Sequence, residues 1–369
     1  MKRGYQFLII LIFVLIFLHG CAPQAIPPEV SIQEKAEVME VPKIEGSTEN
    51  LQEVPEASSK ITEETAIATT EAVEKETVEE KPYRCGKLFD AYTRITGGPQ
   101  DSGEVQESEL ISLLAARMQE NNVGCAFLVT VDITDFDAPQ QIQESIDRNY
   151  DLLKPYPNKF TPFLDLDAES SSDFTVERIQ QILTEAEGKI DYKGFGEVSF
   201  VDPGPWKSKK LTDKPLPEII DFLGKNNLIF AAHLRNGQTT ELETILSEYP
   251  KTKVLVHGSP SGMKELLVKH KNLYYAAELE IMLSDGTYGC SISVSDKDVN
   301  SAISQYGPII AAAPDQVLWA TNAASKCQFQ PQFYSKLMEF TNKFIEKLPE
   351  EHREKFAYKN AEGLLAGGA

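Results

Sequence analysis

The stretch that decides the fold is NLIFAAHLRNGQTTELETILSEYPKTKVLVHG, Asn227 to Gly258. It begins with NLIFAAHL and ends with KVLVHG, two nearly continuous apolar runs of the kind expected for strands buried on both faces. Between them, ELETILSEY spaces its apolar residues at the period of an amphipathic helix. A strand, a helix and a second strand in this order predict a parallel βαβ unit.

The same unit recurs from Cys85 to the C-terminus, with helical patterns between successive apolar runs. The predicted strands are 87–95, 125–133, 160–167, 192–201, 227–234, 253–259, 272–279 and 316–323. Eight strand-helix units predict an α/β fold, a (β/α)₈ TIM barrel, with closing helices between Gln332 and Leu365. A doubly wound open sheet is the alternative, but no Gly-x-Gly-x-x-Gly follows the first predicted strand.

The N-terminus has the features of a targeting segment. Lys2 and Arg3 precede QFLIILIFVLIFL, an apolar run too short for a comfortable membrane span. The following LHGC resembles the L-x-G-C lipobox of prokaryotic lipoproteins, in which the cysteine is lipidated. The resemblance implies that 1–21 is a signal peptide ending at lipidated Cys21, and that the protein is held at the cell envelope, outside the cytoplasm, by a lipid anchor in the membrane. An ordinary secretory signal or membrane anchor is the alternative.

Residues 22–83 form a separate, acidic segment. They contain 15 Glu against 5 Lys, so this segment carries about half of the net charge of −20. Its composition buries too little apolar surface to offset the entropy of ordering, which predicts a disordered tether ahead of one domain at 84–369. The negative charge argues against nucleic acid as a partner, because phosphate would be repelled.

A TIM barrel places functional groups at the C-terminal ends of its strands. His233 and His257 occupy equivalent positions on adjacent predicted strands, which is a stronger sign of function than one isolated histidine. The polar residues at these ends are Tyr92, Arg94, Asp132, Asp165, Asp167, Glu197, His233, His257, Glu278, Glu280 and Asn322.

These strand ends resemble the amidohydrolase superfamily. The likeness rests on the order of GEV, AAHLRNG, LVHGSPSG, WATNAA and YKNAEGLL, and it covers nearly the whole chain from Cys85. It is similar to both the amidohydrolase-related branch, which includes decarboxylases, and the TatD-type branch of metal-dependent hydrolases. The resemblance implies metal ligands at the barrel mouth: an H-x-H on strand one, Glu or Lys on strand four, His on strands five and six, and Asp on strand eight. The metal lowers the pKa of bound water, and that Asp takes its proton.

The sequence departs from this pattern at two strands. Strand one carries Tyr92 and Arg94 at the H-x-H positions, and strand eight carries Asn322 instead of Asp. An arginine is not a metal ligand, and an asparagine does not accept a proton as a carboxylate does. We therefore expect Arg94 to replace a metal ion and pair with Glu197, in a pocket that attracts an anion.

Two main functions remain open, and so does the question of whether the protein is an enzyme. The first is a surface-anchored amidohydrolase-like barrel that has lost or altered its hydrolase activity and binds a small-molecule or anionic ligand without metal. The second is an active mononuclear hydrolase, in which Glu197, His233 and His257 hold one divalent metal, zinc or manganese.

The supporting residues differ between these functions. For the hydrolase, the candidate bases are Asp165, Asp167, Glu278 and Glu280. Tyr92, Asp165, Asp167 and Glu278 are expected to line the pocket in either case. A third alternative is a glycosidase with Glu197 and Glu278 as its two carboxylates.

Four cysteines follow Cys21, and an even number in an exported protein favours disulfides, with three possible pairings. The predicted barrel places Cys85 and Cys125 at the starts of neighbouring strands. It places Cys290 and Cys327 in the loops after strands seven and eight. We therefore expect the pairs Cys85–Cys125 and Cys290–Cys327.

Overall fold

The computed structural model describes residues 85–95, 106–130, 133, 139–165, 175–201, 206–279 and 294–367. The predicted signal peptide with Cys21 and the predicted tether at 22–83 lie outside these ranges. In the described ranges, no helix is both long enough and apolar enough to span a membrane.

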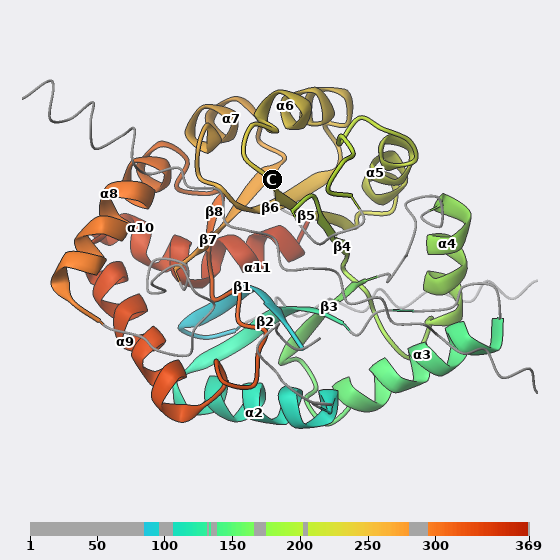
Figure 1. Ribbon diagram of the computed structural model, residues 1–369, viewed down its shortest axis with the longest axis horizontal. Helices are drawn as coiled ribbons and strands as arrows, with labels where there is room; N and C mark the ends of the chain where they lie inside the picture. Colours follow the sequence, from blue (N-terminus) through green and yellow to red (C-terminus); the bar gives the residue numbers. More distant parts are fainter. Residues whose placement is uncertain are drawn as a thin grey trace, which may run out of the picture. The chain divides into compact units, whose positions relative to one another are not determined.

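Eight parallel strands form a single sheet in chain order, from β1 to β8, which confirms the predicted (β/α)₈ TIM barrel (Figure 1). The ring closes where Thr93 of the first strand pairs with Ala323, just after the last strand. The amide of Arg94 donates to the Ala323 carbonyl at 3.1 Å, and the amide of Asn322 donates to the Tyr92 carbonyl at 3.0 Å. The strands are β1 Leu88–Arg94, β2 Val123–Val129, β3 Phe160–Leu164, β4 Gly194–Ser199, β5 Ile229–Leu234, β6 Lys253–Gly258, β7 Leu273–Glu278 and β8 Val317–Ala320.

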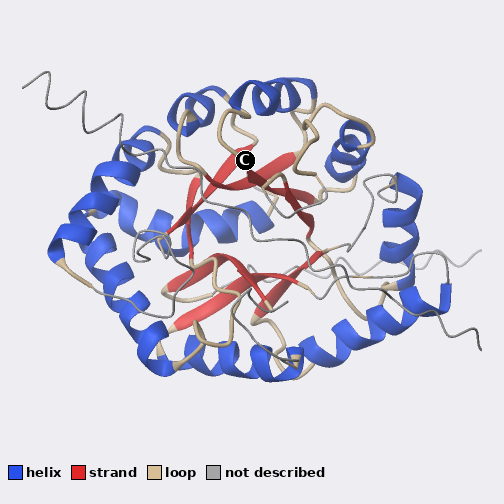
Figure 2. Ribbon diagram, in the orientation of Figure 1, coloured by secondary structure: helices blue, strands red, loops and turns tan. Residues whose placement is uncertain are grey.

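Helices follow the strands and surround the sheet (Figure 2). The helices of the repeating units turn buried apolar residues inward, as α4 does with Ile179 and Ile182. The helices of the repeating units are α2 Glu107–Glu120, α3 Pro139–Leu153, α4 Val176–Glu185, α5 Leu216–Lys225, α6 Thr239–Glu248, α7 Met263–Lys269 and α8 Asp296–Ala312. The closing helices are α9 Pro331–Lys347, α10 Glu350–Glu354, the π-helical turn η2 Lys355–Lys359 and α11 Asn360–Leu365.

The barrel interior has its own apolar core, separate from the layer between strands and helices. The ring centroids of Phe89 and Phe127 lie 4.7 Å apart, and those of Phe127 and Phe163 lie 5.1 Å apart. Ala361 and Leu364 of α11 belong to the same cluster. Lys253 at the start of β6 donates to the Leu364 carbonyl, so the last helix covers the barrel end opposite the C-terminal strand ends.

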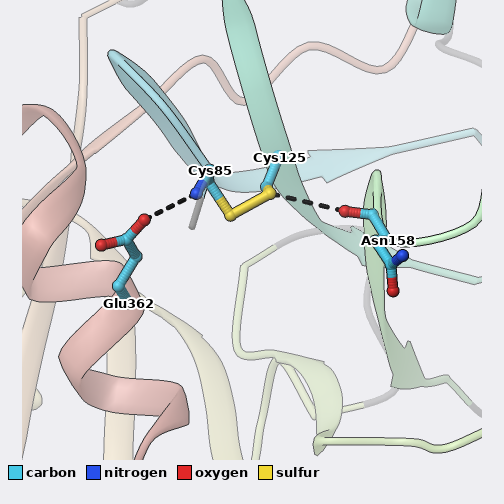
Figure 3. The surroundings of a disulfide bond; sticks show 4 residues. All are labelled: Cys85, Cys125, Asn158 and Glu362. Carbon is cyan, nitrogen blue, oxygen red and sulfur yellow. Dashed lines mark hydrogen bonds between the residues drawn. A yellow bond between two sulfur atoms is a disulfide. The ribbon is translucent and has the colours of Figure 1, made fainter. Parts of the chain in front are cut away.

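A disulfide joins Cys85 to Cys125, the pairing predicted for these two cysteines (Figure 3). Cys125 is the third residue of β2, not its first as the sequence suggested, because β2 begins two residues earlier. Glu362 of α11 accepts a hydrogen bond from the Cys85 amide at 2.7 Å. The first strand is thus attached to both β2 and the last helix. Cys327 is disulfide-bonded; Cys290, its predicted partner, falls outside the described ranges.

Candidate metal centre

Glu197 enters the barrel because β4 contains a β-bulge. Phe195 and Val198 pair with Phe230 and Ala232 of β5, so three steps on β4 face two steps on β5. Gly196 makes the bulge possible: its φ is +116°, and a Cβ there would lie 2.2 Å from the Ala231 carbonyl oxygen. The extra residue turns the Glu197 side chain inward, where it is 4 % exposed.

His233 and His257 face this carboxylate from the next two strands. They are direct partners in the register of β5 and β6, and their ring centroids lie 4.2 Å apart. Nδ1 of His233 is 3.0 Å from Oε1 of Glu197, and Nε2 of His257 is 3.4 Å from the same oxygen. Three consecutive strands therefore bring the predicted Glu-His-His set together.

The two nitrogens of His257 have different surroundings. Nδ1 hydrogen-bonds Oε1 of Glu278 on β7, and both side chains are 1 % exposed. Nε2 is buried and has no hydrogen-bond partner in the described part of the chain, since its contact with Glu197 lacks hydrogen-bond geometry. A carboxylate on one imidazole nitrogen, with the other nitrogen facing two further donors, is the usual arrangement of a metal-binding histidine.

The donor set fits one divalent metal ion. The donor atoms of Glu197, His233 and His257 all lie within 4.8 Å of one another. A tetrahedral ion with bonds of about 2.1 Å separates its ligand atoms by roughly 3.4 Å, close to the two distances to Oε1 of Glu197. Two histidines and a carboxylate are also a ligand set that catalytic zinc sites use.

Arg94 forms the predicted ion pair with Glu197. Its Nη1 lies 3.3 Å from Oε2, so the carboxylate offers one oxygen to the histidines and the other to the guanidinium. The Arg94 side chain is 33 % exposed, whereas Glu197 is buried. The guanidinium therefore lies between the buried centre and the outside, where it can also bind an anion.

The charges of this cluster depend on one another. Burial would raise the pKa of Glu197, but the charge of His257 and the hydrogen bond from His233 outweigh it and lower this pKa to about 2. Burial would lower the pKa of His257, but Glu278 and Glu197 raise it to about 9. Without a metal, the carboxylate is therefore ionised and His257 is protonated at neutral pH.

Asp90 is a buried carboxylate that the sequence analysis missed. It accepts hydrogen bonds from the Thr321 amide at 2.9 Å, the Thr321 hydroxyl at 2.5 Å and the Tyr92 amide at 3.2 Å. Burial raises its pKa to about 7, although the two bonds from Thr321 oppose this. The signal was an aspartate inside the apolar run LFDAYT. Asp90 fixes the backbone beside Tyr92 and Asn322, which are two of the three residues that stand where the resemblance implied metal ligands.

Several buried polar atoms around the centre have no partner among the described residues. Tyr92 stacks on His257 at a centroid distance of 4.1 Å, and its hydroxyl is one of these atoms. Asn322 has a φ of 53°, and its side-chain Oδ1 is also buried without a partner among the described residues. The other two side-chain atoms are Nε of Arg94 and Oε2 of Glu278. Buried polar groups normally have partners, so this grouping indicates a place where a ligand or water binds.

The remaining predicted residues are placed as follows. Asp165 follows the end of β3, while Asp132, Asp167 and Glu280 are outside the described ranges. His257 contacts both Glu197 and Glu278, so it separates the two carboxylates proposed for a glycosidase.

Two surface cavities in the described part of the chain lie away from this centre. One is lined by residues of α4 and α5, including Leu183 and Phe222. The other lies beside α9 and α10 and includes Ile345 and Arg353. Neither contains a residue of the Glu-His-His set.

No family model matches the sequence, and no curated protein does. Among solved structures, the chain is similar to amidohydrolase-superfamily members with a TIM-barrel fold. An amidohydrolase from Burkholderia multivorans with bound zinc has 11 % identity and a TM-score of 0.54, covering 76 % of this chain and 99 % of its own.

Two further structures give a similar result. A probable 2-pyrone-4,6-dicarboxylic acid hydrolase from Acinetobacter baumannii, with citric acid bound, has 11 % identity, a TM-score of 0.50 and coverage of 76 % and 99 %. A 4-oxalomesaconate hydratase from Rhodopseudomonas palustris has 13 % identity, a TM-score of 0.50 and coverage of 76 % and 96 %. At these identities the similarity shows the fold alone.

Proposed function

We propose that this protein is an amidohydrolase-like barrel whose mouth holds one divalent metal ion and binds a small anionic molecule beside it. Glu197, His233 and His257 are the proposed metal ligands. The observation that carries the proposal is the buried Nε2 of His257, which has no hydrogen-bond partner in the described part of the chain and faces the other two donors, while Glu278 holds Nδ1. The Burkholderia amidohydrolase structure contains bound zinc, which supports a divalent ion such as zinc in this proposal.

A metal bound at this centre would polarise a carbonyl group and lower the pKa of bound water. The side chains have separate roles around it. Glu278 orients His257, and Arg94 binds a negatively charged group of the ligand. Asn322 can hydrogen-bond a ligand, but it lacks the carboxylate that would take a proton from water. We therefore expect ligand binding to be retained and hydrolysis to be slow or lost.

An anionic ligand agrees with the position of Arg94. Its guanidinium is about one-third exposed and uses only part of its five N–H donors on Glu197. The Acinetobacter structure has citric acid bound, which supports a carboxylate-bearing ligand for this chain. For this chain the comparison supports a ligand class and no individual compound.

A second candidate function is anion binding without a metal. The observation in its favour is the 3.3 Å ion pair between Arg94 and Glu197, which gives the buried carboxylate a cationic partner already. In this case the guanidinium takes the electrostatic role of the ion, and His257 stays protonated between Glu197 and Glu278.

We also propose that the barrel acts outside the cytoplasm, held at the membrane by a lipid on Cys21. The proposal rests on the LHGC sequence that follows the short apolar run. Replacing Cys21 by Ser should move the protein from the membrane fraction to the soluble fraction or block its processing. An unmodified Cys21 found by mass spectrometry of the purified protein would contradict it.

The metal is tested on the full chain, purified in detergent without chelator and then loaded with zinc or manganese. We expect about one ion per chain, lost in His233→Ala and kept in the matched control His352→Ala on α10. No stoichiometric metal together with Arg94-dependent carboxylate binding would favour the second candidate. Neither metal nor carboxylate binding would reject both.

A further inference from the structure

The Glu197 carboxylate is shared between two kinds of partner. Its Oε1 lies 3.0 Å from Nδ1 of His233 and 3.4 Å from Nε2 of His257. Its Oε2 accepts a hydrogen bond from Nη1 of Arg94 at 3.3 Å. A metal ion bound by the two histidines and the Arg94 guanidinium would therefore both be neutralised by this single carboxylate.

Arg94 is the partner in this ion pair that can move. Glu197 is 4 % exposed, and its side chain is held inside the barrel by the β4 bulge and by His233. The Arg94 backbone is fixed by its bond to the Ala323 carbonyl, but the side chain is 33 % exposed. Within the described ranges, the guanidinium has no partner other than Glu197. It can therefore turn to an anion at the barrel mouth without breaking a second contact.

The charges of the centre favour an anion once a metal ion is bound. Histidines that bind a metal are neutral, so Glu197 and Glu278 carry the negative charge of the centre. These two carboxylates face three positive charges, one on Arg94 and two on a divalent ion. Both carboxylates are almost fully buried, so water screens the excess poorly. A carboxylate that binds Arg94 balances this excess and leaves more of the charge of Glu197 to the metal ion.

We propose that Arg94 couples metal binding to anion binding at the barrel mouth. An anion on its guanidinium strengthens the binding of the metal ion at Glu197, and the metal ion strengthens the binding of the anion in return. The inference rests on the proposed function, in which Glu197 is a metal ligand and Arg94 binds a carboxylate. Arg94 acts through Glu197, so it is a positioning residue for the metal ion. Coupling between two sites is reciprocal, and both directions must give the same factor.

The test measures the zinc affinity of the full chain in detergent, by competition with a chromophoric chelator at one pH. Acetate is replaced by chloride at equal ionic strength. Acetate should raise the zinc affinity by about tenfold, which is within the usual range for coupled sites. Acetate that binds zinc in solution cannot give this result, because it would weaken the apparent affinity. Titration calorimetry should show that zinc tightens acetate binding by the same factor.

Arg94→Met removes the guanidinium and keeps a side chain of similar length. Without acetate, this variant should bind zinc about as tightly as the unaltered chain does with acetate. Acetate should then change its zinc affinity by less than about twofold, because the link between the sites is lost. The matched control is Arg148→Met, which removes an exposed arginine of α3 and should respond to acetate as the unaltered chain does.

Methanesulfonate gives a second measurement on the unaltered chain, which is needed if Arg94→Met does not fold. This anion pairs with a guanidinium but is a poor zinc ligand, so it should also raise the zinc affinity. An effect of acetate without any effect of methanesulfonate would mean that acetate binds the metal ion directly, and coupling through Arg94 would be wrong. An equal effect of acetate in Arg94→Met and the unaltered chain would have the same meaning.

Failure of the coupling and failure of the proposed function give different results. One zinc ion per chain, with an affinity that neither anion raises, would leave the metal centre standing and overturn this inference alone. If neither the unaltered chain nor Arg94→Met binds zinc under any of these conditions, the metal centre and the coupling are both wrong.

Discussion

His257 is the residue on which the chemistry of the barrel mouth depends. Its two nitrogens contact two different carboxylates, and its ring is covered by Tyr92 on one side. Nε2 lies 3.4 Å from Oε1 of Glu197, and the His233 ring lies beside it. A protein that needed this histidine only for packing would not require a buried carboxylate on each nitrogen, because unpaired buried charge is destabilising.

The role of Glu278 can be tested separately from the fold. Glu278→Gln keeps the size of the side chain but removes the charge that orients His257. We expect zinc affinity to fall by about 10- to 100-fold, as for other second carboxylates behind metal-binding histidines. Zinc titration of the full chain measures this, with the exposed Glu265→Gln of α7 as control. Equal zinc affinities in the two variants would show that Glu278 does not support a metal ligand.

The raised pKa of Asp90 predicts how stability depends on pH. The folded protein holds this proton more tightly than the unfolded chain, so Asp90 stabilises the fold fully below pH 3.8 and loses that contribution as pH rises to about 7. The loss amounts to about 4 kcal/mol, since each pKa unit corresponds to about 1.4 kcal/mol. Between pH 4 and pH 8, Asp90→Asn should gain stability relative to the unaltered protein by up to this amount. Denaturant unfolding at both pH values gives the difference, and a difference independent of pH would contradict the assignment.

At the residue scale, sequence reasoning identified the central ligands but not their supports. His233 and His257 were recognisable because both follow apolar strands in the same register. Glu278 was expected in the pocket, but its bond to His257 depends on where β7 lies against β6. Asp90 was missed because a carboxylate in an apolar run acquires a role only when Thr321, far away in sequence, closes the barrel beside it.

Among the elements, β4 determines the site because its bulge orients Glu197. The strand itself was predictable from its apolar sequence. The bulge was not, because it arises from the pairing of β4 with β5. The glycines at 194 and 196 were the available signal: one lies against the Phe163 ring and the other against the Ala231 carbonyl, where no side chain fits.

Gly196→Ala tests the bulge directly. Alanine at φ +116° with a Cβ 2.2 Å from the Ala231 oxygen must shift the backbone. We expect a loss of about 3 kcal/mol in unfolding free energy, together with loss of metal binding. Gly188→Ala is the control, because its φ is +79° but a Cβ there meets nothing within 4 Å. It should lose about 1–2 kcal/mol and keep the metal. Equal losses of unfolding free energy in both variants would mean that the close contact between the added Cβ and the Ala231 oxygen does not contribute.

The Cys85–Cys125 disulfide stabilises the first two strands against the unfolded chain. The cysteines are 40 residues apart, and closing a loop of this length contributes about 4 kcal/mol. Cys85→Ala/Cys125→Ala should lower the free energy of unfolding by about this amount in chemical denaturation. The double substitution is preferable to a reductant because it leaves Cys327 untouched. A change below about 1 kcal/mol would show that β1 is held mainly by its strand pairing and by Glu362.

For the whole molecule, the barrel could be predicted because eight similar units repeat and each unit carries its own strand and helix signals. The predicted strand limits agree with the structure to within a few residues at most ends. The sequence could not predict whether the Arg94 guanidinium or a metal ion accompanies the Glu197 carboxylate at the barrel mouth. Arg94 and the two histidines all converge on Glu197, and their competition depends on distances of a few ångströms.

The most direct test of the metal centre is an anomalous diffraction map of zinc-loaded crystals of the full chain, recorded at the zinc absorption edge. The account predicts one peak per chain, about 2.0–2.2 Å from a nitrogen of His233, Nε2 of His257 and an oxygen of Glu197. An occupied peak elsewhere, or no peak while Arg94 remains paired with Glu197, would contradict the claim that the barrel mouth is a metal site.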